Sequence, residues 1–386
     1  MTTPFSGSNT ENWYVVETTA GETPASPVWT KLRNTGGIPA LTKDTLISNE
    51  LNGSREITSV RTGGKQVSGE FPVELSQSSQ DELIANAMTS QWVSGVTGAA
   101  LDITVDEAAK TFTRAAGDFV SDGVVVGDLV YFADLTGNNA KPFIATTVTS
   151  TVITGAGITV TLTDETVSTD YATADKIGTG SLCKSISIMT WFKGKCGTAD
   201  KYLITRGLEF TGFSYEIAVN AQVTGSFPFI ARSQEVIASP PAGSTYNADS
   251  TTIPYSGVDG KILVENAVQA LFTSATITND NAASAQFELG SDSTSFIERG
   301  NATNTISVSA FMADTVLLER FINETETGFT SILSGVDGAM SFSLPNAFIT
   351  AATPEIGGAT SITQTVEATG TGNSNESSII VQRLTY

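Results

Sequence analysis

The chain has 386 residues, with 20 Lys and Arg against 40 Asp and Glu, so its formal charge is −20, and it contains no histidine. The missing histidine excludes serine–histidine and cysteine–histidine hydrolysis and any histidine-ligated metal site. The negative charge argues against tight wrapping of nucleic acid, which needs basic surfaces. The only cysteines are Cys183 and Cys196, so we exclude a tetracysteine zinc site and expect two free thiols in a cytoplasm.

Residues 1–27 are predicted to form an extended N-terminal arm. Three prolines interrupt this segment, and it shows little periodicity. Its start has neither a basic nor an apolar region, and no stretch approaches about 18 apolar residues, so we expect no signal peptide and no transmembrane helix. Trp13 and Tyr14 are too apolar to be left in water. We therefore predict that these two side chains contact a neighbouring subunit.

Residues 28–90 are predicted to form a β hairpin followed by a short helix. After a glycine-rich turn, residues 66–75 alternate between apolar and polar side chains, which is typical of a half-buried strand. Ser79 and Glu82 have the spacing of a capping box. The apolar residues that follow have helical spacing, so we predict a helix over 80–89.

Residues 91–180 are predicted to form a small β-barrel inserted into the first domain. Lys and Arg become scarce here, while Val, Thr, Asp and Gly dominate. Strand-like stretches at 117–132, 145–154 and 158–163 are separated by glycine turns. The first domain then resumes over 181–235.

The C-terminal part begins after a linker predicted at 236–261. Pro240 and Pro241 mark this linker, because proline cannot donate a hydrogen bond to a sheet. Residues 262–386 again have the pattern of strands, with one helix predicted at 314–323 from its apolar spacing.

The two domains repeat the same order of elements. A strand, a glycine turn, an alternating strand and a helix occur in both, and Arg61 and Arg299 each precede the turn. Further on, residues 201–217 align with 347–362. We therefore predict an internal duplication. Open sheets lose their edges when copies join side by side into a closed barrel, so each chain would supply two quasi-equivalent units to a ring.

No combination of residues predicts catalysis, and we expect no enzymatic activity, cofactor or metal. Adjacent acids occur at 81–82, 106–107 and 164–165, but each pair lies at a turn or a helix start, where acids are favoured. Four further aspartates lack the spacing of a calcium loop and fit turns better: Asp118, Asp122, Asp128 and Asp134. Two other classes stay open, a secreted or surface-layer-like β adhesin and a carbohydrate-active enzyme with two carboxylates.

Two stretches carry a family resemblance: RTGGKQVSGEFPVEL at 61–75 with the helix after it, and RGLEFTGFSYEIAVNAQVTGSFPFI at 206–230. Their layout resembles the tail tube proteins (major tail proteins) of long non-contractile-tailed bacteriophages, the siphophages. The resemblance covers both halves of the chain. It implies a mainly β fold with two tandem tail-tube β-sandwich domains, each with a flanking α-helix and long hairpins, plus the inserted small β-barrel domain.

The resemblance also implies a function. The protein would be a structural virion protein, assembled in the host cytoplasm into stacked rings that form the tail tube. The tape measure protein and viral DNA would occupy the lumen without specific binding, and other tail proteins would meet the tube ends. A duplicated chain implies trimeric rings with pseudo-sixfold symmetry, although hexameric rings stay open. The inserted domain would decorate the exterior and contact the host surface, so its deletion is expected to leave assembly intact.

Charge adds expectations for single residues. An acidic lumen repels phosphates and lets DNA slide. The alternation in 66–75 separates acidic from apolar side chains, so we predict that Glu70 and Glu74 line the lumen. Of the 20 basic residues, 17 lie at or before Lys261. We expect four of them to contact acidic surfaces of neighbouring subunits: Arg61, Lys65, Lys193 and Lys195.

Overall fold

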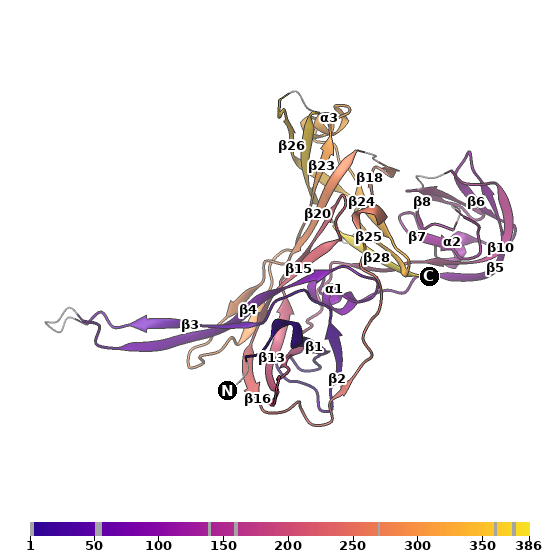
Figure 1. Cartoon of the computed structure of the whole chain (residues 1–386). Helices are drawn as coiled ribbons and strands as arrows, with labels where there is room; N and C mark the ends of the chain where they lie inside the picture. Colours follow the sequence, from indigo (N-terminus) through magenta and orange to yellow (C-terminus); the bar gives the residue numbers. More distant parts are fainter. Residues whose placement is uncertain are drawn as a thin grey trace.

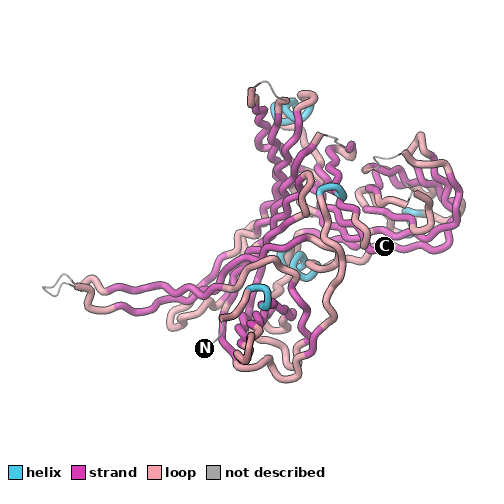
Figure 2. Tube along the Cα trace, viewed as in Figure 1, coloured by secondary structure: helices cyan, strands magenta, loops and turns pink. Residues whose placement is uncertain are grey.

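The structure is a computed structural model that describes residues 4–50, 56–137, 140–157, 161–268, 271–358, 361–372 and 376–386. Two β-sandwich repeats share one continuous sheet, and a closed β-barrel lies to one side of them (Figure 1). Strands dominate throughout, with only short helices among the described residues (Figure 2). The predicted mainly β fold with an inserted barrel is confirmed.

Repeat 1 consists of an outer sheet, a share of the inner sheet and one helix. The outer sheet contains β17 (Thr245–Tyr246), β2 (Val28–Leu32), β1 (Thr10–Val16), β12 (Ile186–Phe192), β13 (Lys201–Phe210) and β16 (Ser233–Ile237). The inner sheet contains β3 (Ala40–Ile47), β4 (Val60–Glu74), β15 (Thr224–Ala231) and β14 (Gly212–Ala218). The helix α1 (Asp81–Ala87) packs on β13 and β14, and a short 3-10 turn, η1 (Gly7–Asn9), precedes β1.

Repeat 2 is built in the same way. Its outer sheet contains β19 (Ala267–Val268), β18 (Gly260–Val264), β24 (Phe329–Ser334), β25 (Gly338–Leu344) and β28 (Ile380–Thr385). Its inner strands are β20 (Phe272–Asp280), β23 (Thr303–Phe311), β27 (Thr363–Gly370) and β26 (Ala347–Glu355). The helix α3 (Val316–Ile322) packs on β26. The 3-10 turn η2 (Gly257–Asp259) precedes β18, and β21 (Ser284–Gln286) and β22 (Phe296–Glu298) form a separate hairpin.

Most strand pairings of the two repeats correspond, although the β13–β15 and β17–β2 pairings of repeat 1 have no counterpart in repeat 2 among the described residues. In the outer sheets, β2–β1–β12–β13–β16 corresponds to β19–β18–β24–β25–β28. In the inner sheet, β3–β4–β15–β14 corresponds to β20–β23–β27–β26. The alignment of 201–217 with 347–362 is wrong, because β26 takes the place of β14 and β25 takes the place of β13. The duplication is present, but β13 and β14 correspond to β25 and β26 rather than to residues 347–362.

One junction joins the two repeats into a continuous inner sheet. Strand β14 pairs antiparallel with β20, from Gly212 opposite Asp280 to Ala218 opposite Ser274. A Cβ on Gly212 would lie 2.0 Å from the carbonyl oxygen of Asn279, so only glycine allows this close approach. The inner sheet therefore runs β3–β4–β15–β14–β20–β23–β27–β26.

The two repeats also share one hydrophobic core between the inner and outer sheets. Phe71 of β4 stacks on Phe229 of β15, with ring centroids 4.7 Å apart. Across the junction, Phe342 of repeat 2 lies 5.3 Å from the ring of Tyr215 and 6.3 Å from that of Phe213, both in repeat 1. Aromatic burial of this kind makes each repeat depend on the other for part of its core.

The inserted domain is a closed barrel with its own core. Its strands follow the order β10 (Glu165–Thr173), β5 (Thr97–Asp106), β6 (Thr111–Arg114), β9 (Val152–Ala156), β8 (Phe143–Val148) and β7 (Leu129–Phe132). Phe112 stacks on Phe143 and Phe132, with centroids 4.3 and 5.2 Å away. Part of the stretch predicted as strand at 117–132 is instead the short helix α2 (Phe119–Asp122), capped by Asp118. The strand predicted at 158–163 lies partly outside the described residues.

The barrel is docked firmly on the outer face of repeat 2. After the barrel, β11 (Asp175–Gly178) adds to the outer sheet beside β28. The Gln382 side chain accepts from the Leu129 backbone N–H at 2.8 Å. An apolar cluster joins Leu129 and Ile144 of the barrel to repeat 2, where it includes Leu263, Ile332 and Leu384. This apolar cluster, which is separate from the core inside the barrel, holds the insert against the sandwich.

Three local predictions are wrong. Residues 10–16 of the predicted arm form β1, which lies between β2 and β12. Helix α1 begins after Gln80 with no side-chain cap, and the Ser79 hydroxyl instead accepts a hydrogen bond from Arg33. The predicted linker is not a free connection, because part of it packs against repeat 1. Within it, Tyr255 is buried, and its backbone N–H donates a hydrogen bond to the carbonyl of Leu75.

Candidate assembly surfaces

The inner sheet buries one face and exposes the other. Outside the β3–β4 arm, buried aliphatic and aromatic side chains mostly alternate along the strands with less buried, mainly small polar ones, because successive strand residues point to opposite faces. The small polar set spans both repeats: Gln66, Ser68, Ser214, Ser226, Thr276, Thr278, Thr305, Ser307, Thr365 and Thr369. The register places these residues side by side across the strands. These small polar side chains form a band across the exposed face of both repeats.

Acidic side chains lie on the same face. Glu70 is exposed and accepts a hydrogen bond from the Ser226 hydroxyl at 3.0 Å, while Glu74 is half-buried. Thr224 pairs with Glu74 on one side and with Glu216 on the other, so Glu216 shares this face. Glu367 occupies the equivalent face of β27 and is exposed. The alternation of their strands is a sequence signal that could have indicated Glu216 and Glu367. The sequence does not show that the strand register places them on the same face as Glu70 and Glu74.

Basic side chains are missing from most of this surface. None of β14, β15, β20, β23, β26 and β27 contains Lys or Arg, and the structure describes every residue of these six strands. Only β3 and β4 have basic residues, Lys43, Arg61 and Lys65, toward the end where these two strands form a projecting arm. Outside this arm, the exposed face of the inner sheet therefore carries negative or no charge.

Both ends of the inner sheet are open edges. Strand β3 pairs with β4, strand β26 pairs with β27, and neither has a second strand partner among the described residues. The β3–β4 arm reaches away from the body of the molecule (Figure 1). Every residue of β3 is exposed. Unpaired strand edges invite further pairing, so these two edges are candidate contacts between copies.

Two of the basic residues predicted to contact neighbours find acidic partners within the chain. Lys65 forms an ion pair with Asp292 of repeat 2. The Lys193 ammonium lies 2.8 Å from Glu11 and 4.6 Å from the ring centroid of Trp191. Of the other two candidates, Arg61 is exposed on the arm and Lys195 is half-buried.

Trp13 and Tyr14 are buried inside the chain itself, each with 6% of its surface exposed. The Trp13 ring meets Tyr246 edge-on, with centroids 4.9 Å apart, and Tyr14 belongs to the shared core. Their apolar surface is thus covered by repeat 1, which corrects the expectation that a neighbouring subunit covers it. Sequence could not distinguish the two cases, because both bury the same side chains.

Buried ion pairs and an amide tie repeat 2 to repeat 1. Arg299 lies 2.7 Å from the carboxylate of Glu209, and burial raises the pKa of Glu209 while Arg299 opposes that rise. Arg383 of β28 pairs with Asp81 at the start of α1 and stacks on Trp92 at 4.4 Å. Asn281 donates to the backbone of α1. Repeat 2 thus covers α1 from the side.

The structure places the acidic residues that the sequence singled out in α1 and in the barrel. Of the adjacent acid pairs, 81–82 lies at α1 and the other two lie in the barrel. Asp118 caps α2, Asp122 and Asp128 pair with Arg114 and Lys176, and no metal-binding cluster occurs among the residues that the structure describes. Both cysteines are exposed and unpaired. No helix in the described ranges is long and apolar enough to cross a membrane.

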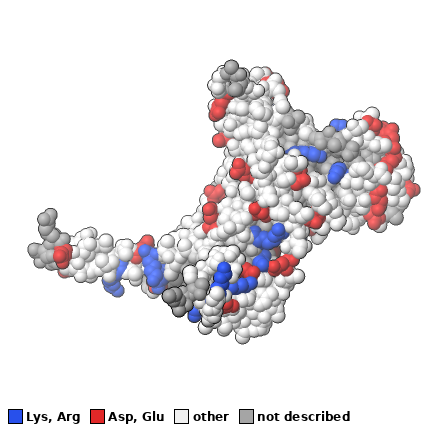
Figure 3. All heavy atoms as spheres, in the orientation of Figure 1, with Lys and Arg blue, Asp and Glu red and all other residues white. Residues whose placement is uncertain are grey.

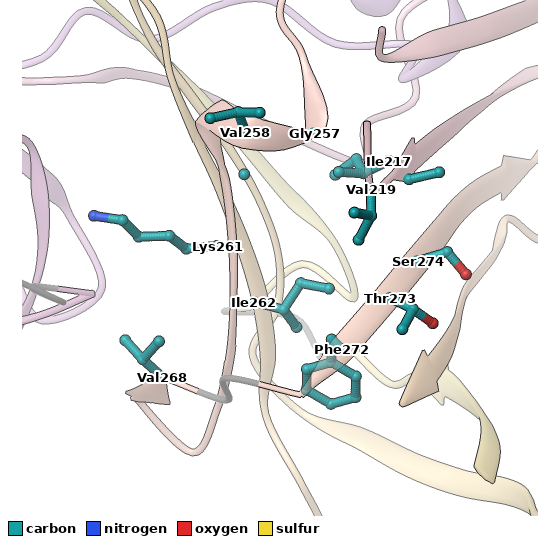
Figure 4. A pocket seen from close by; sticks show the side chains of 12 residues that line it. Ile217, Val219, Gly257, Val258, Lys261, Ile262, Val268, Phe272, Thr273 and Ser274 are labelled. Carbon is teal, nitrogen blue, oxygen red and sulfur yellow. The ribbon is translucent and has the colours of Figure 1, made fainter. Parts of the chain in front are cut away.

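A cavity of about 310 Å³ lies where the β14–β20 junction meets β18 (Figure 4). Among the described residues, its walls include Ile217, Val219, Ile262 and Phe272, and its one charged side chain is Lys261. The Lys261 ammonium donates to the carbonyl of Gly157 in the barrel at 3.0 Å, and burial lowers its pKa. The described lining therefore offers a single titratable group rather than an acid–base pair.

Comparison with known proteins identifies the family. The family model described as phage tail tube protein matches residues 7–370, which include repeat 1, the barrel and every strand of repeat 2 except β28. The chain matches none of the curated proteins with which it was compared. The match extends over nearly the whole chain and agrees with the β-sandwich architecture. This chain therefore belongs to the phage tail tube protein family and is a structural component of a phage tail.

Proposed function

We propose that this protein polymerises as stacked rings into the tube of a long, non-contractile phage tail, and that its inner sheets form the wall of an acidic channel for DNA ejection. One observation carries the proposal. The inner sheet is continuous through both repeats, and outside the β3–β4 arm its exposed face is neutral or acidic, with Glu70, Glu74, Glu216 and Glu367 on it. A polyanion slides best along a wall that offers it no cations.

The β14–β20 junction provides a template for ring closure. Strand β26 corresponds to β14, and β3 corresponds to β20, so β26 of one copy pairs with the β3 edge of the next. Each chain contributes two equivalent units, and three chains complete a ring with pseudo-sixfold symmetry. Such closure removes both open edges of the sheet at once.

The remaining partners follow from this arrangement. The tape measure protein and then viral DNA occupy the lumen without specific binding, and other tail proteins meet the exposed ring faces at the tube ends. Assembly takes place in the host cytoplasm. The barrel packs on the side of the outer sheet turned away from the core, where Ile332 contacts it while Leu333 faces the core. It therefore decorates the exterior, where it contacts the host surface.

Electron microscopy and native mass spectrometry of the purified chain test the proposal. We expect hollow tubes or rings with a regular axial repeat, and a ring mass equal to three chains. A ring of six chains would correct the symmetry while keeping the tube. Monodisperse monomers that persist at high protein concentration would refute the tube itself.

A further inference from the structure

The two equivalent helices differ sharply in burial. In α1, five side chains are buried: Leu83, Ile84, Ala85, Asn86 and Ala87. In α3 none is buried, and Val316 and Ile322 are 49% and 67% exposed. The two helices occupy the same place in their repeats, so the difference comes from their surroundings. Repeat 2 covers α1 through Arg383 and Asn281, whereas no described element covers α3 in this way.

A groove beside α3 remains open as a result. This α3 groove has a volume of about 440 Å³ and is lined mainly by apolar side chains, among them Leu271, Phe272, Phe311, Met312, Val316 and Leu317. Three charged residues also line it: Glu265, Asp314 and Arg320. One buried polar group also lines it. Gln364 is 3% exposed, and its amide nitrogen has no hydrogen-bond partner among the described residues. A buried donor without an acceptor is costly, so this one favours a partner that brings a carbonyl or carboxylate.

The charges of the two repeats indicate what that partner is. Repeat 1, taken as residues 1–90 and 181–246, contains 12 basic and 14 acidic residues. Repeat 2, taken as residues 260–386, contains 4 basic and 13 acidic residues. On the face shown in Figure 3, Lys and Arg lie on the arm, on the lower body and where the upper part meets the barrel, while the upper part around α3 shows acidic atoms at its edge. Repeat 2 of one copy is therefore repelled less by repeat 1 of another copy than by a second repeat 2.

We propose that the α3 groove binds the outer edge of repeat 1 from a second copy, centred on β16, in a head-to-tail contact; this inference rests on the proposed function. Within one chain, β28 covers α1. Because β16 corresponds to β28 and α3 to α1, the same contact between copies places β16 against α3. Val236 on β16 is 71% exposed and supplies an apolar side chain to the groove.

The first test replaces one groove residue without harming its helix. Val316→Asp places a carboxylate in the first turn of α3, where the helix dipole stabilises it, so the helix should persist while a charge replaces an apolar side chain of the groove. Val120→Asp makes the same change in the first turn of the exposed helix α2 of the barrel, where Val120 is 55% exposed. We expect Val316→Asp to abolish rings and tubes, and Val120→Asp to assemble like the wild type.

The second test pairs the two sides of the contact. Val236→Asp should also leave folded monomers. In an equimolar mixture, the intact α3 groove of the Val236→Asp chain can bind the intact β16 edge of the Val316→Asp chain. Light scattering after size exclusion should then show a dimer in the mixture and only monomers of each variant alone. Circular dichroism of each variant should match the wild type.

The outcomes separate this inference from the proposed function. Wild-type tubes together with normal assembly of Val316→Asp would overturn the α3 contact and leave the tube function standing. A mixture that stays monomeric would overturn the pairing of α3 with β16. A wild-type chain that never assembles would overturn the proposed function itself, and the α3 contact with it.

Discussion

One side chain at the junction between the repeats, Tyr215, leaves a polar group of the shared core without a hydrogen bond to any described residue. The Tyr215 ring packs against Phe227 and Phe342, but its hydroxyl is buried without a hydrogen-bond partner among the described residues. Burial raises the pKa of this phenol well above its ordinary value, and the negative charge of Asp81 raises it further. Tyr255 is buried too, but its hydroxyl donates to Gln77 at 2.6 Å.

This pair of tyrosines makes a matched prediction. Tyr215→Phe removes an unsatisfied hydroxyl and keeps the ring, so the free energy of unfolding should stay the same or rise by about 1 kcal/mol. Tyr255→Phe loses a hydrogen bond and leaves the Gln77 oxygen unpaired, so it should lower that free energy by about 1–2 kcal/mol. Denaturant unfolding of both variants measures the difference. Equal losses would show that the Tyr215 hydroxyl has a partner, such as bound water.

At the scale of elements, the ends of the inserted barrel lie together. The Val96 backbone N–H donates to the Thr173 hydroxyl at 2.8 Å, and Val93 forms a β-bridge with Lys176. The sequence-based boundaries 91–180 include Trp92, which packs on Arg383, and β11, which pairs with β28. These residues belong physically to the sandwich rather than to the barrel.

Two deletions test this boundary. Removing 97–173 with a short turn between Val96 and Ala174 should leave β11 in place and let tubes assemble. Removing 91–180 strips the outer sheet of its edge strand, so this variant should melt roughly 5 °C lower than the shorter deletion. Both deletions expose the same apolar docking surface on repeat 2, so that effect cancels in the comparison. Equal melting temperatures by calorimetry would show that β11 adds nothing to the sheet.

At the scale of the whole molecule, the acidic inner face should keep DNA mobile. Tubes of a Glu216→Lys, Glu367→Lys double variant would have cations on that face, and should retain roughly tenfold more duplex DNA at low salt. A matched double variant on the barrel, Asp102→Lys with Glu107→Lys, changes the net charge equally but on the exposed surface of the insert. Sedimentation of tubes with labelled DNA measures retention. Equal retention by the two variants would place the inner face outside the channel.

Sequence patterns predicted the elements whose signal is local. The alternation in 66–75 predicted β4 and the acidic positions Glu70 and Glu74, since strand periodicity depends only on which side chains face a core. The duplication and the helices at α1 and α3 were predicted for the same reason. The capping box at Ser79 was not formed, because Arg33 and neighbouring hydroxyls bind that side chain instead. A capping motif in the sequence does not form when tertiary contacts occupy the side-chain atoms that the cap would use.

By itself, the sequence determined a mainly β chain with two related halves, an inserted domain and an excess of acidic residues, because composition and periodicity carry this information. Only the tertiary structure decided that Trp13 and Tyr14 are buried inside the chain, that β14 pairs with β20, and that α1 is covered while α3 is open. These features depend on register and on contacts between residues far apart in the chain. A strand edge looks the same in sequence whether its partner lies in the same molecule or in the next.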